Sequence, residues 1–205
     1  KHRIEQEKSY LSYDYGQGYF YQSIPDVNIT GFRDTALRVS QLNLEKILQN
    51  KSVLDIGSNA GAILFNLRKI IKLGTGVENN SFLIKISNQI KEYLSAQNLS
   101  FVKQNFEDYR SPVKFDIILS FANHKTYDGN TKQNLFEYFK KIHSLLNING
   151  KLIFESHPPE IETREQYNDV IKNIKLFFNI IETPNVVMKG FLDRNRKYLI
   201  CSPIK

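Results

Sequence analysis

Short apolar runs alternate with segments of helical periodicity along most of this chain. The first clear pair is the apolar run Val53–Ile56, which has the length of a strand, and residues 62–71, whose apolar side chains recur at helical spacing. Further strands are expected at 99–103, 115–121, 151–154, 177–182 and 197–202. Further helices are expected at 34–49, 81–94, 131–146 and 163–176. This alternation is typical of an α/β domain with a mostly parallel sheet.

The turn between the first strand and its helix excludes two common phosphate-binding motifs. It reads Gly57-Ser58-Asn59-Ala60-Gly61, and Asn59 and Ala62 occupy positions where a dinucleotide fingerprint requires glycine. No Gly-Lys-Ser/Thr follows the turn, so it is not a Walker P-loop. What remains is acidic-x-Gly-x-x-x-Gly, with Glu78 closing the second strand 21 residues after Gly57. A carboxylate at that place can accept two hydrogen bonds from a ribose diol.

This arrangement resembles the class I S-adenosylmethionine-dependent methyltransferases. The resemblance implies a three-layer Rossmann-like fold, with a mostly parallel seven-stranded sheet and an antiparallel strand near the C-terminus. It also implies S-adenosyl-L-methionine as cofactor and S-adenosyl-L-homocysteine as product. The sequence departs from many members at Asn59, where they carry glycine.

The resemblance further implies a set of cofactor-binding residues. The first strand and its turn would hold the methionine part, Glu78 the ribose, and the residues after the third strand the adenine. Tyr21 and Arg38 would reach the methionine end, because a tyrosine-rich segment and an arginine-bearing helix precede the turn, as in small-RNA 5′-capping and several glycan and small-molecule methyltransferases. Arg33 is expected to be a solvated surface charge. The full set is Tyr21, Arg38, Asp55, Gly57, Ser58, Asn59, Gly61, Glu78, Asn79, Asn105, Phe106, Glu107, Ser120 and Phe121.

Two histidines lie beyond the carboxyl ends of strands that should be neighbours. His124 follows the fourth strand and His157 follows the fifth, and ligands of open α/β sheets bind at that edge. Histidine can remove a proton from a hydroxyl acceptor near neutral pH. His124 is the first candidate for general base, and His157 is the second, as partner, orienter or acceptor ligand. No residue spacing specifies a metal site, so no metal is expected.

Length, charge and cysteine content indicate the domain organisation, the class of partner and the location of the protein. A chain of 205 residues with 41% hydrophobic content suits one domain, 1–205, in which 1–33 form an aromatic arm or lid. The basic residues behind the net charge of +7 are scattered, which favours a compositional bias over a nucleic-acid footprint. The single cysteine, Cys201, agrees with a reducing cytoplasm, and neither membrane insertion nor export is expected.

The acceptor is therefore expected to be a small molecule or glycan, as in surface-polysaccharide or natural-product biosynthesis. The Asn-Pro-Pro-Tyr signature of amino-directed nucleic-acid methyltransferases is absent after the fourth strand, which favours an oxygen acceptor. Two alternatives stay open. One is an RNA methyltransferase acting on a 5′ end or on tRNA, and the other is a cofactor-binding module without catalysis.

Overall fold

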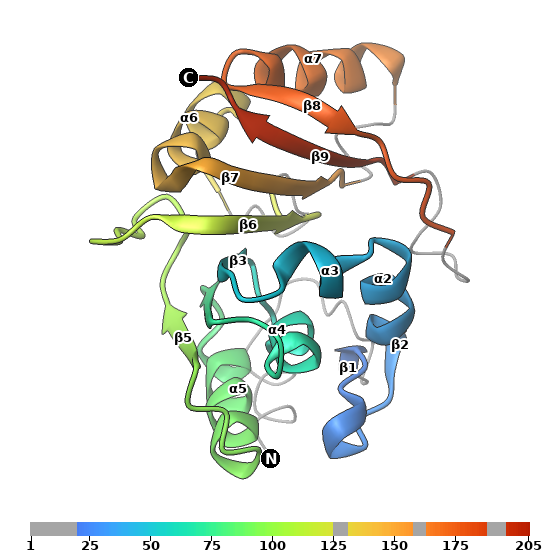
Figure 1. Ribbon diagram of the computed structural model, residues 1–205, viewed down its shortest axis with the longest axis vertical. Coiled ribbons are helices and arrows are strands. Elements are labelled where there is room, and N and C mark those ends of the chain that lie inside the picture. Colours follow the sequence, from blue (N-terminus) through green and yellow to red (C-terminus); the bar gives the residue numbers. More distant parts are fainter. Residues whose placement is uncertain (1–19, 125–130, 158–162, 188–195) are drawn as a thin grey trace.

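One seven-stranded sheet organises the part of the chain that the computed structural model describes, which is residues 20–124, 131–157, 163–187 and 196–205 (Figure 1). The strand order is β5-β4-β3-β6-β7-β9-β8, and β9 runs antiparallel to both of its neighbours. The strands are β3 (Ser52–Ile56), β4 (Leu73–Glu78), β5 (Leu99–Lys103), β6 (Phe115–Phe121), β7 (Leu146–Glu155), β8 (Phe178–Glu182) and β9 (Tyr198–Pro203). The fold class expected from the sequence is confirmed.

Helices cover both faces of the sheet and make two separate hydrophobic cores. Alternate residues of β3 face opposite cores, Val53 packing with α2 to α5 and Leu54 packing with α6 and α7. This layering follows from the parallel strands, which are buried on both faces. The helices are α2 (Thr35–Gln41), α3 (Leu44–Leu48), α4 (Ala62–Leu67), α5 (Ser81–Tyr93), α6 (Leu135–Leu145) and α7 (Arg164–Lys175).

Two helix boundaries differ from those expected from the sequence. The helix expected over 34–49 is two helices, because Asn43 between them adopts a left-handed conformation with φ of 51°. The helix expected from residue 131 begins instead at Leu135, where the side chain of Asn134 accepts from the Glu137 amide in a capping box. It ends at Leu145 and the chain enters β7 directly.

The described part of the expected N-terminal arm forms a small sheet of its own. β1 (Phe20–Gln22) pairs in parallel with β2 (Gly31–Arg33), and the short 3₁₀ helix η1 (Pro25–Val27) lies between them. Residues 1–19 of that arm lie outside the described residues. The pairing places the side chains of β1 and β2 beside the carboxyl edge of the large sheet, where Tyr21 and Arg33 line a cavity.

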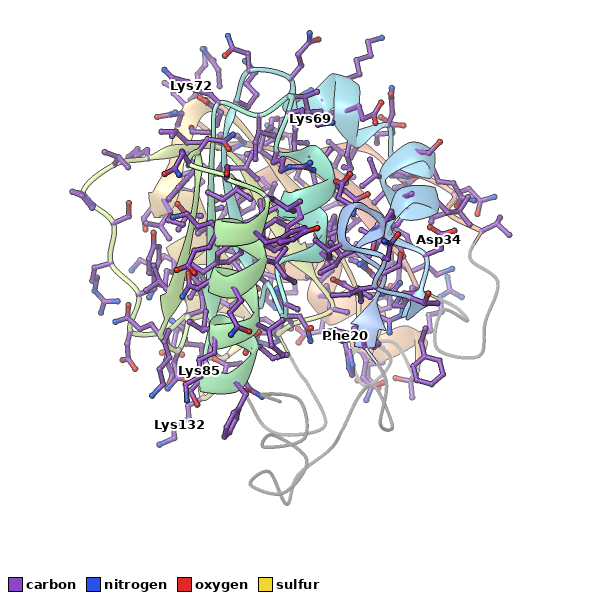
Figure 2. All side chains as sticks on the ribbon, turned by 90° about the horizontal axis from the view of Figure 1, so that it is seen from below. Phe20, Asp34, Lys69, Lys72, Lys85 and Lys132 are labelled. Carbon is purple, nitrogen blue, oxygen red and sulfur yellow. The ribbon has the colours of Figure 1, made fainter. Side chains whose placement is uncertain are left out.

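Within the described ranges, we find no helix with both the length and the apolar character that crossing a bilayer requires. The four exposed lysines labelled in Figure 2 lie on two parts of the surface, Lys69 and Lys72 on one and Lys85 and Lys132 on the other. Lys69 and Lys72 lie in the connection between α4 and β4, Lys85 lies on α5, and Lys132 lies before α6.

Candidate functional site

A cavity lies where the strand order reverses. From β3 the sheet continues through β4 and β5 in one direction and through β6 and β7 in the other, so the carboxyl ends of β3 and β6 border a crevice. Residues from all five strand ends reach it. The lining residues are Tyr21, Gln22, Arg33, Ile56, Gly57, Asn59, Val77, Glu78, Asn79, Gln104, Asn105, Phe106, Phe121, Ala122, Asn123, Thr131, Tyr138 and His157.

The glycine turn after β3 is held in a conformation that few other residues adopt. Gly57, Asn59 and Gly61 all have positive φ, of 65°, 51° and 80°. A Cβ at Gly61 would stand 2.6 Å from the ring of Phe101, so the position is closed to a side chain. Asparagine is one of the few other residues that tolerates the left-handed region, which explains how Asn59 replaces the more usual glycine.

Glu78 at the end of β4 fixes this turn. Its Oε2 accepts from the Asn59 amide at 3.0 Å, and its Oε1 accepts from the Asn80 amide at 2.9 Å. Asn80 in turn caps α5, because its Oδ1 accepts from the amides of Phe82 and Leu83. One carboxylate therefore joins the glycine turn to the start of α5 while it lines the cavity.

Asp55 and Arg38 lie behind the turn rather than in the cavity. Asp55 is 4% exposed and Arg38 is 1% exposed. Burial raises the pKa of Asp55 to about 7; nearby Arg38 opposes that rise and Glu78 adds to it. Burial, together with the neighbouring Arg33, lowers the pKa of Arg38 to about 9. The guanidinium of Arg38 also packs over the Phe121 ring, 4.4 Å from its centre.

A buried network of hydrogen bonds joins the end of β6 to α6 and supports one wall of the cavity. The Ser120 hydroxyl lies 2.8 Å from the Tyr138 hydroxyl, and both groups donate to Oδ1 of Asn123. The side-chain amide of Asn123 donates to the Ile56 carbonyl, which connects the end of β6 to the end of β3. Ser120 is thus a support for the wall, and Tyr138 and Asn123 present the surface. Phe106 completes it, its ring meeting that of Tyr138 edge-on at 5.4 Å.

The two histidines expected at the strand ends have different positions. His157 lines the cavity. His124 is 3% exposed and is not among the lining residues. Its Nε2 lies 3.1 Å from the Gln133 carbonyl, and its ring packs 4.7 Å from that of Tyr138. Among the described residues, no group of three or more histidine, cysteine and carboxylate side chains is placed to hold a metal.

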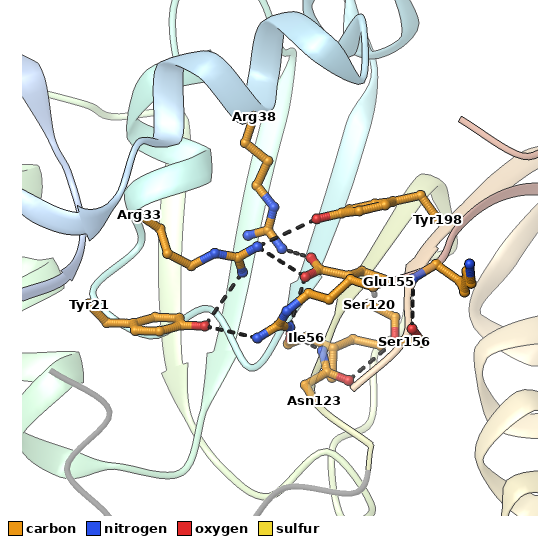
Figure 3. Close-up of polar contacts among 11 residues, drawn as sticks. Tyr21, Arg33, Arg38, Ile56, Ser120, Asn123, Glu155, Ser156 and Tyr198 are labelled. Carbon is orange, nitrogen blue, oxygen red and sulfur yellow. Dashed lines mark hydrogen bonds and ion pairs between the residues drawn. The ribbon is translucent and has the colours of Figure 1, made fainter. Parts of the chain in front are cut away.

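Arg33 is buried, and the expectation of a surface charge was wrong. Only 2% of the residue is exposed, because β1 and β2 fold it against the end of β7. Its Nη2 donates to Glu155 Oε1 at 3.1 Å and to the Tyr198 hydroxyl at 3.4 Å, and its Nη1 donates to the Tyr21 hydroxyl at 3.5 Å (Figure 3). The sequence did not indicate this burial, because the ion-pair partner Glu155 is 122 residues away.

The structure brings just over half of the expected site residues together around the cavity. The lining ones are Tyr21, Gly57, Asn59, Glu78, Asn79, Asn105, Phe106, Phe121 and His157. The ones outside the lining are Arg38, Asp55, Ser58, Gly61, Glu107, Ser120 and His124. Glu107 instead accepts from the amide of Lys132 at 2.9 Å. Asn123 and Tyr138 also line the cavity and were not expected to. Asn123 directly precedes the candidate His124, whereas Tyr138 lies on α6, far from any candidate in the sequence.

Comparisons with known proteins agree with this geometry. Residues 47–194 match a family model described as a methyltransferase domain. Over 85 residues the chain is 39% identical to "Ribosomal RNA small subunit methyltransferase G" of Helicobacter pylori and of Helicobacter acinonychis. Each match covers 38% of this chain and 46% of the relative, so the chain spans about half the length of these curated relatives.

Solved structures share the fold at low sequence identity. N-methyltransferase NodS from Bradyrhizobium japonicum, in complex with S-adenosyl-l-homocysteine, aligns with a TM-score of 0.65 and 15% identity over 82% of this chain and 85% of its own. A SAM-dependent methyltransferase from Aquifex aeolicus aligns with a TM-score of 0.65 and 12% identity over 94% of this chain and 100% of its own. These likenesses concern the fold.

Proposed function

Because this chain belongs to the methyltransferase domain family that its residues 47–194 match, we propose that it methylates an oxygen atom of a small-molecule or carbohydrate-type acceptor. The family recognised from the sequence, and with it the cofactor S-adenosylmethionine, is confirmed. We further propose that residues 1–205 form one domain. A cytoplasmic location stays a prediction.

The glycine turn and Glu78 are the observation that carries the cofactor assignment. The left-handed turn leaves backbone without side chains at Gly57, beside the Glu78 carboxylate, at the switch point of the sheet. We assign the ribose to Glu78 and the adenine to Asn105 and Phe106, an amide and a ring on the same side of the cavity as β4 and β5. Arg38, Asp55, Ser58, Gly61, Glu107 and Ser120 would then act through neighbours that line the cavity.

His157 is the better placed of the two candidate bases. When bound, S-adenosylmethionine supplies a methyl group on a sulfonium that is already a good leaving group. The protein must then hold the acceptor oxygen in line and accept its proton. His157 lines the cavity, and His124 is packed against Tyr138 behind its wall. We therefore propose His157 as the base and His124 as a residue that positions Tyr138.

Turnover of the His157→Asn variant tests this assignment. Transfer of a labelled methyl group to a panel of hydroxyl acceptors should fall by about 10²- to 10⁴-fold, because a positioned base contributes that much. Affinity for S-adenosylhomocysteine should not change. His143→Asn is a matched control, since His143 lies on α6 with its Nε2 near the Ile204 carbonyl. Unchanged turnover of His157→Asn would refute the proposal that His157 is the base. A 10²- to 10⁴-fold loss of turnover in His124→Asn, but not in His157→Asn, would assign the role of base to His124 instead.

An RNA acceptor is the second candidate, favoured by the identity to the two ribosomal RNA methyltransferases. The net charge of +7 is compatible with it. Binding to RNA would weaken steeply as salt rises, because counterions are released from the phosphates, whereas a small neutral acceptor would show little dependence. Acceptor KM measured between about 50 and 200 mM salt therefore separates the two candidates.

A further inference from the structure

A lysine of α6 contacts the loop that presents Phe106 to the cavity. The Lys141 ammonium lies over the Phe106 ring, 4.9 Å from the ring centre. Its Nζ also donates to the Glu107 carbonyl at 2.6 Å. Phe106 lines the cavity, whereas Lys141 is not among the lining residues. Lys141 is therefore placed to act on a ligand of the cavity through the Phe106 ring.

The same helix contacts the Phe106 ring a second time. Tyr138 and Lys141 are three residues apart on α6, so their side chains share one face of the helix. The Tyr138 ring meets the Phe106 ring edge-on, with the ring centres 5.4 Å apart. Tyr138 is itself held by the hydrogen bonds of its hydroxyl to Ser120 and Asn123. The helix thus holds the Phe106 ring by two separate contacts, one aromatic and one cationic.

The surroundings of the Lys141 ammonium are unusual for a lysine. A long lysine side chain normally carries its ammonium into water or to a carboxylate. Lys141 is partly buried, and within the described residues its ammonium contacts a ring and a carbonyl but no carboxylate. The Glu107 carboxylate has other partners, since it accepts from the Lys132 amide at 2.9 Å and from the Thr131 hydroxyl at 3.3 Å. The ammonium is therefore held beside the ring by a backbone hydrogen bond and not by an ion pair.

Burial and neighbouring charges make the Lys141 ammonium easier to deprotonate than an ordinary one. Burial lowers its pKa to about 8, and Arg110, whose Nη1 donates to the same Glu107 carbonyl at 3.0 Å, adds to the fall. Asp108 and Glu107 oppose it. Lys141 is therefore mostly charged at neutral pH. An interaction that needs this charge is present below a pH of about 8 and lost above it.

We propose that Lys141 is a positioning residue: its ammonium holds the Phe106 ring in the direction in which that ring packs on the adenine of the cofactor. A cation is attracted to the face of an aromatic ring, and the hydrogen bond to the Glu107 carbonyl fixes where this cation stands. Lys141 does not touch the cofactor and acts only through the ring. The inference rests on the proposed function, which assigns the adenine to Asn105 and Phe106.

Calorimetric titration of S-adenosylhomocysteine into the full chain, between about pH 6.5 and 9.5, tests the proposal. Near neutral pH, Lys141→Met should bind about three- to tenfold more weakly than the wild type, because the attraction between cation and ring is lost. Wild-type affinity should fall by a similar factor as pH rises past about 8. Lys141→Arg should keep the affinity and should not show this fall, because a guanidinium stays charged and also packs on aromatic rings.

Two comparisons isolate the effect of Lys141. Other groups titrate in this pH range, Asp55 among them, so the informative quantity is the difference between the wild type and Lys141→Arg at each pH. Lys140→Met is the matched control and should bind as the wild type does. Lys140 lies over the ring of Phe136, 5.9 Å from its centre, and Phe136 is not among the lining residues.

A double-mutant cycle tests whether Lys141 acts through the ring. In a Phe106→Leu background, Lys141→Met should cause little further loss of affinity, because the ring that the ammonium contacts is already absent. A full additional loss would show that Lys141 acts on the cofactor without Phe106, which would overturn the inference.

Three other results would also overturn it. If Lys141→Met binds S-adenosylhomocysteine as the wild type does across the pH range, the ammonium does not act on the cofactor, and the cofactor assignment stands. If Lys141→Met and Lys141→Arg lose affinity to the same extent, the lysine is needed for the structure of the loop and not for its charge. If the wild type binds no S-adenosylhomocysteine, the proposed function itself fails and the inference fails with it.

Discussion

Replacement of Glu78 by alanine should separate the carboxylate's role in the cofactor site from its role in the fold. In the structure the carboxylate accepts from the amides of Asn59 and Asn80, at 3.0 and 2.9 Å. Each carboxylate oxygen has two lone pairs, so a backbone bond does not prevent it from accepting a ribose hydroxyl as well. Glu78→Ala therefore removes two kinds of hydrogen bond together, and they must be measured separately.

The expected loss of affinity follows from the proposed contacts between Glu78 and the ribose. Hydroxyl groups that lose a charged partner in a partly solvated site cost about 1–3 kcal/mol in total. This corresponds to S-adenosylhomocysteine binding about 5- to 150-fold more weakly to Glu78→Ala in calorimetric titration. The stability cost is separate, since two backbone amides lose their acceptor at about 1–3 kcal/mol each, and urea unfolding measures it. Glu92→Ala, an exposed glutamate on α5, is the control.

A second ligand identifies the cause of the loss. S-adenosylhomocysteine analogues without ribose hydroxyls should bind the wild type more weakly but bind Glu78→Ala almost as well as the parent compound does, because the shared contact is already absent. Equal weakening of both ligands would show that Glu78 acts through the shape of the glycine turn. Unchanged affinity for the parent compound in a folded Glu78→Ala protein would refute the ribose assignment.

Two further predictions concern the residues around the turn. Burial raises the pKa of Asp55 from 3.8 to about 7. Between these two values the folded chain holds a proton that the unfolded chain has released. The free energy of unfolding should therefore fall as pH rises from about 4 to 7, by up to about 4 kcal/mol. Urea unfolding of Asp55→Asn should lack this slope, and parallel pH profiles would contradict it. Gly61→Ala should lower the free energy of unfolding by more than about 1 kcal/mol, because Gly61 has a φ of 80° and the added Cβ would meet the Phe101 ring. Asn59→Gly should leave the free energy of unfolding nearly unchanged. Equal urea midpoints for the two variants would contradict this prediction.

The sequence was sufficient for the sheet and for the lining residues at the ends of β4 and β5, because both depend on local patterns. Strand periodicity and the glycine turn are read from adjacent residues, and the carboxyl ends of parallel strands meet at one edge by geometry. Glu78 and Phe106 could therefore be placed at the cavity from their positions after β4 and β5.

The sequence did not determine which side chains near a strand end reach the cavity and which pack behind its wall. Ser120 lies near the end of β6 and His124 follows it, as expected, but both contact Tyr138 and neither lines the cavity. Arg33 was misjudged for a related reason, since its burial depends on Glu155, a distant residue. A left-handed Asn43 likewise interrupts an apolar periodicity that predicted one continuous helix.

The contacts of Arg33 and Arg196 with Glu155 and Tyr21 also have a consequence for the order in which the molecule folds. Arg33 and Glu155 are 122 residues apart, and Tyr21 and Arg196 are 175 residues apart. Contacts of such separation form late, because a long loop must close before they contribute. During synthesis the glycine turn and its flanking strands can pair long before Arg196 leaves the ribosome. We therefore expect a nascent chain to form the glycine turn and its flanking strands before the contacts of Arg33 and Arg196 with Glu155 and Tyr21.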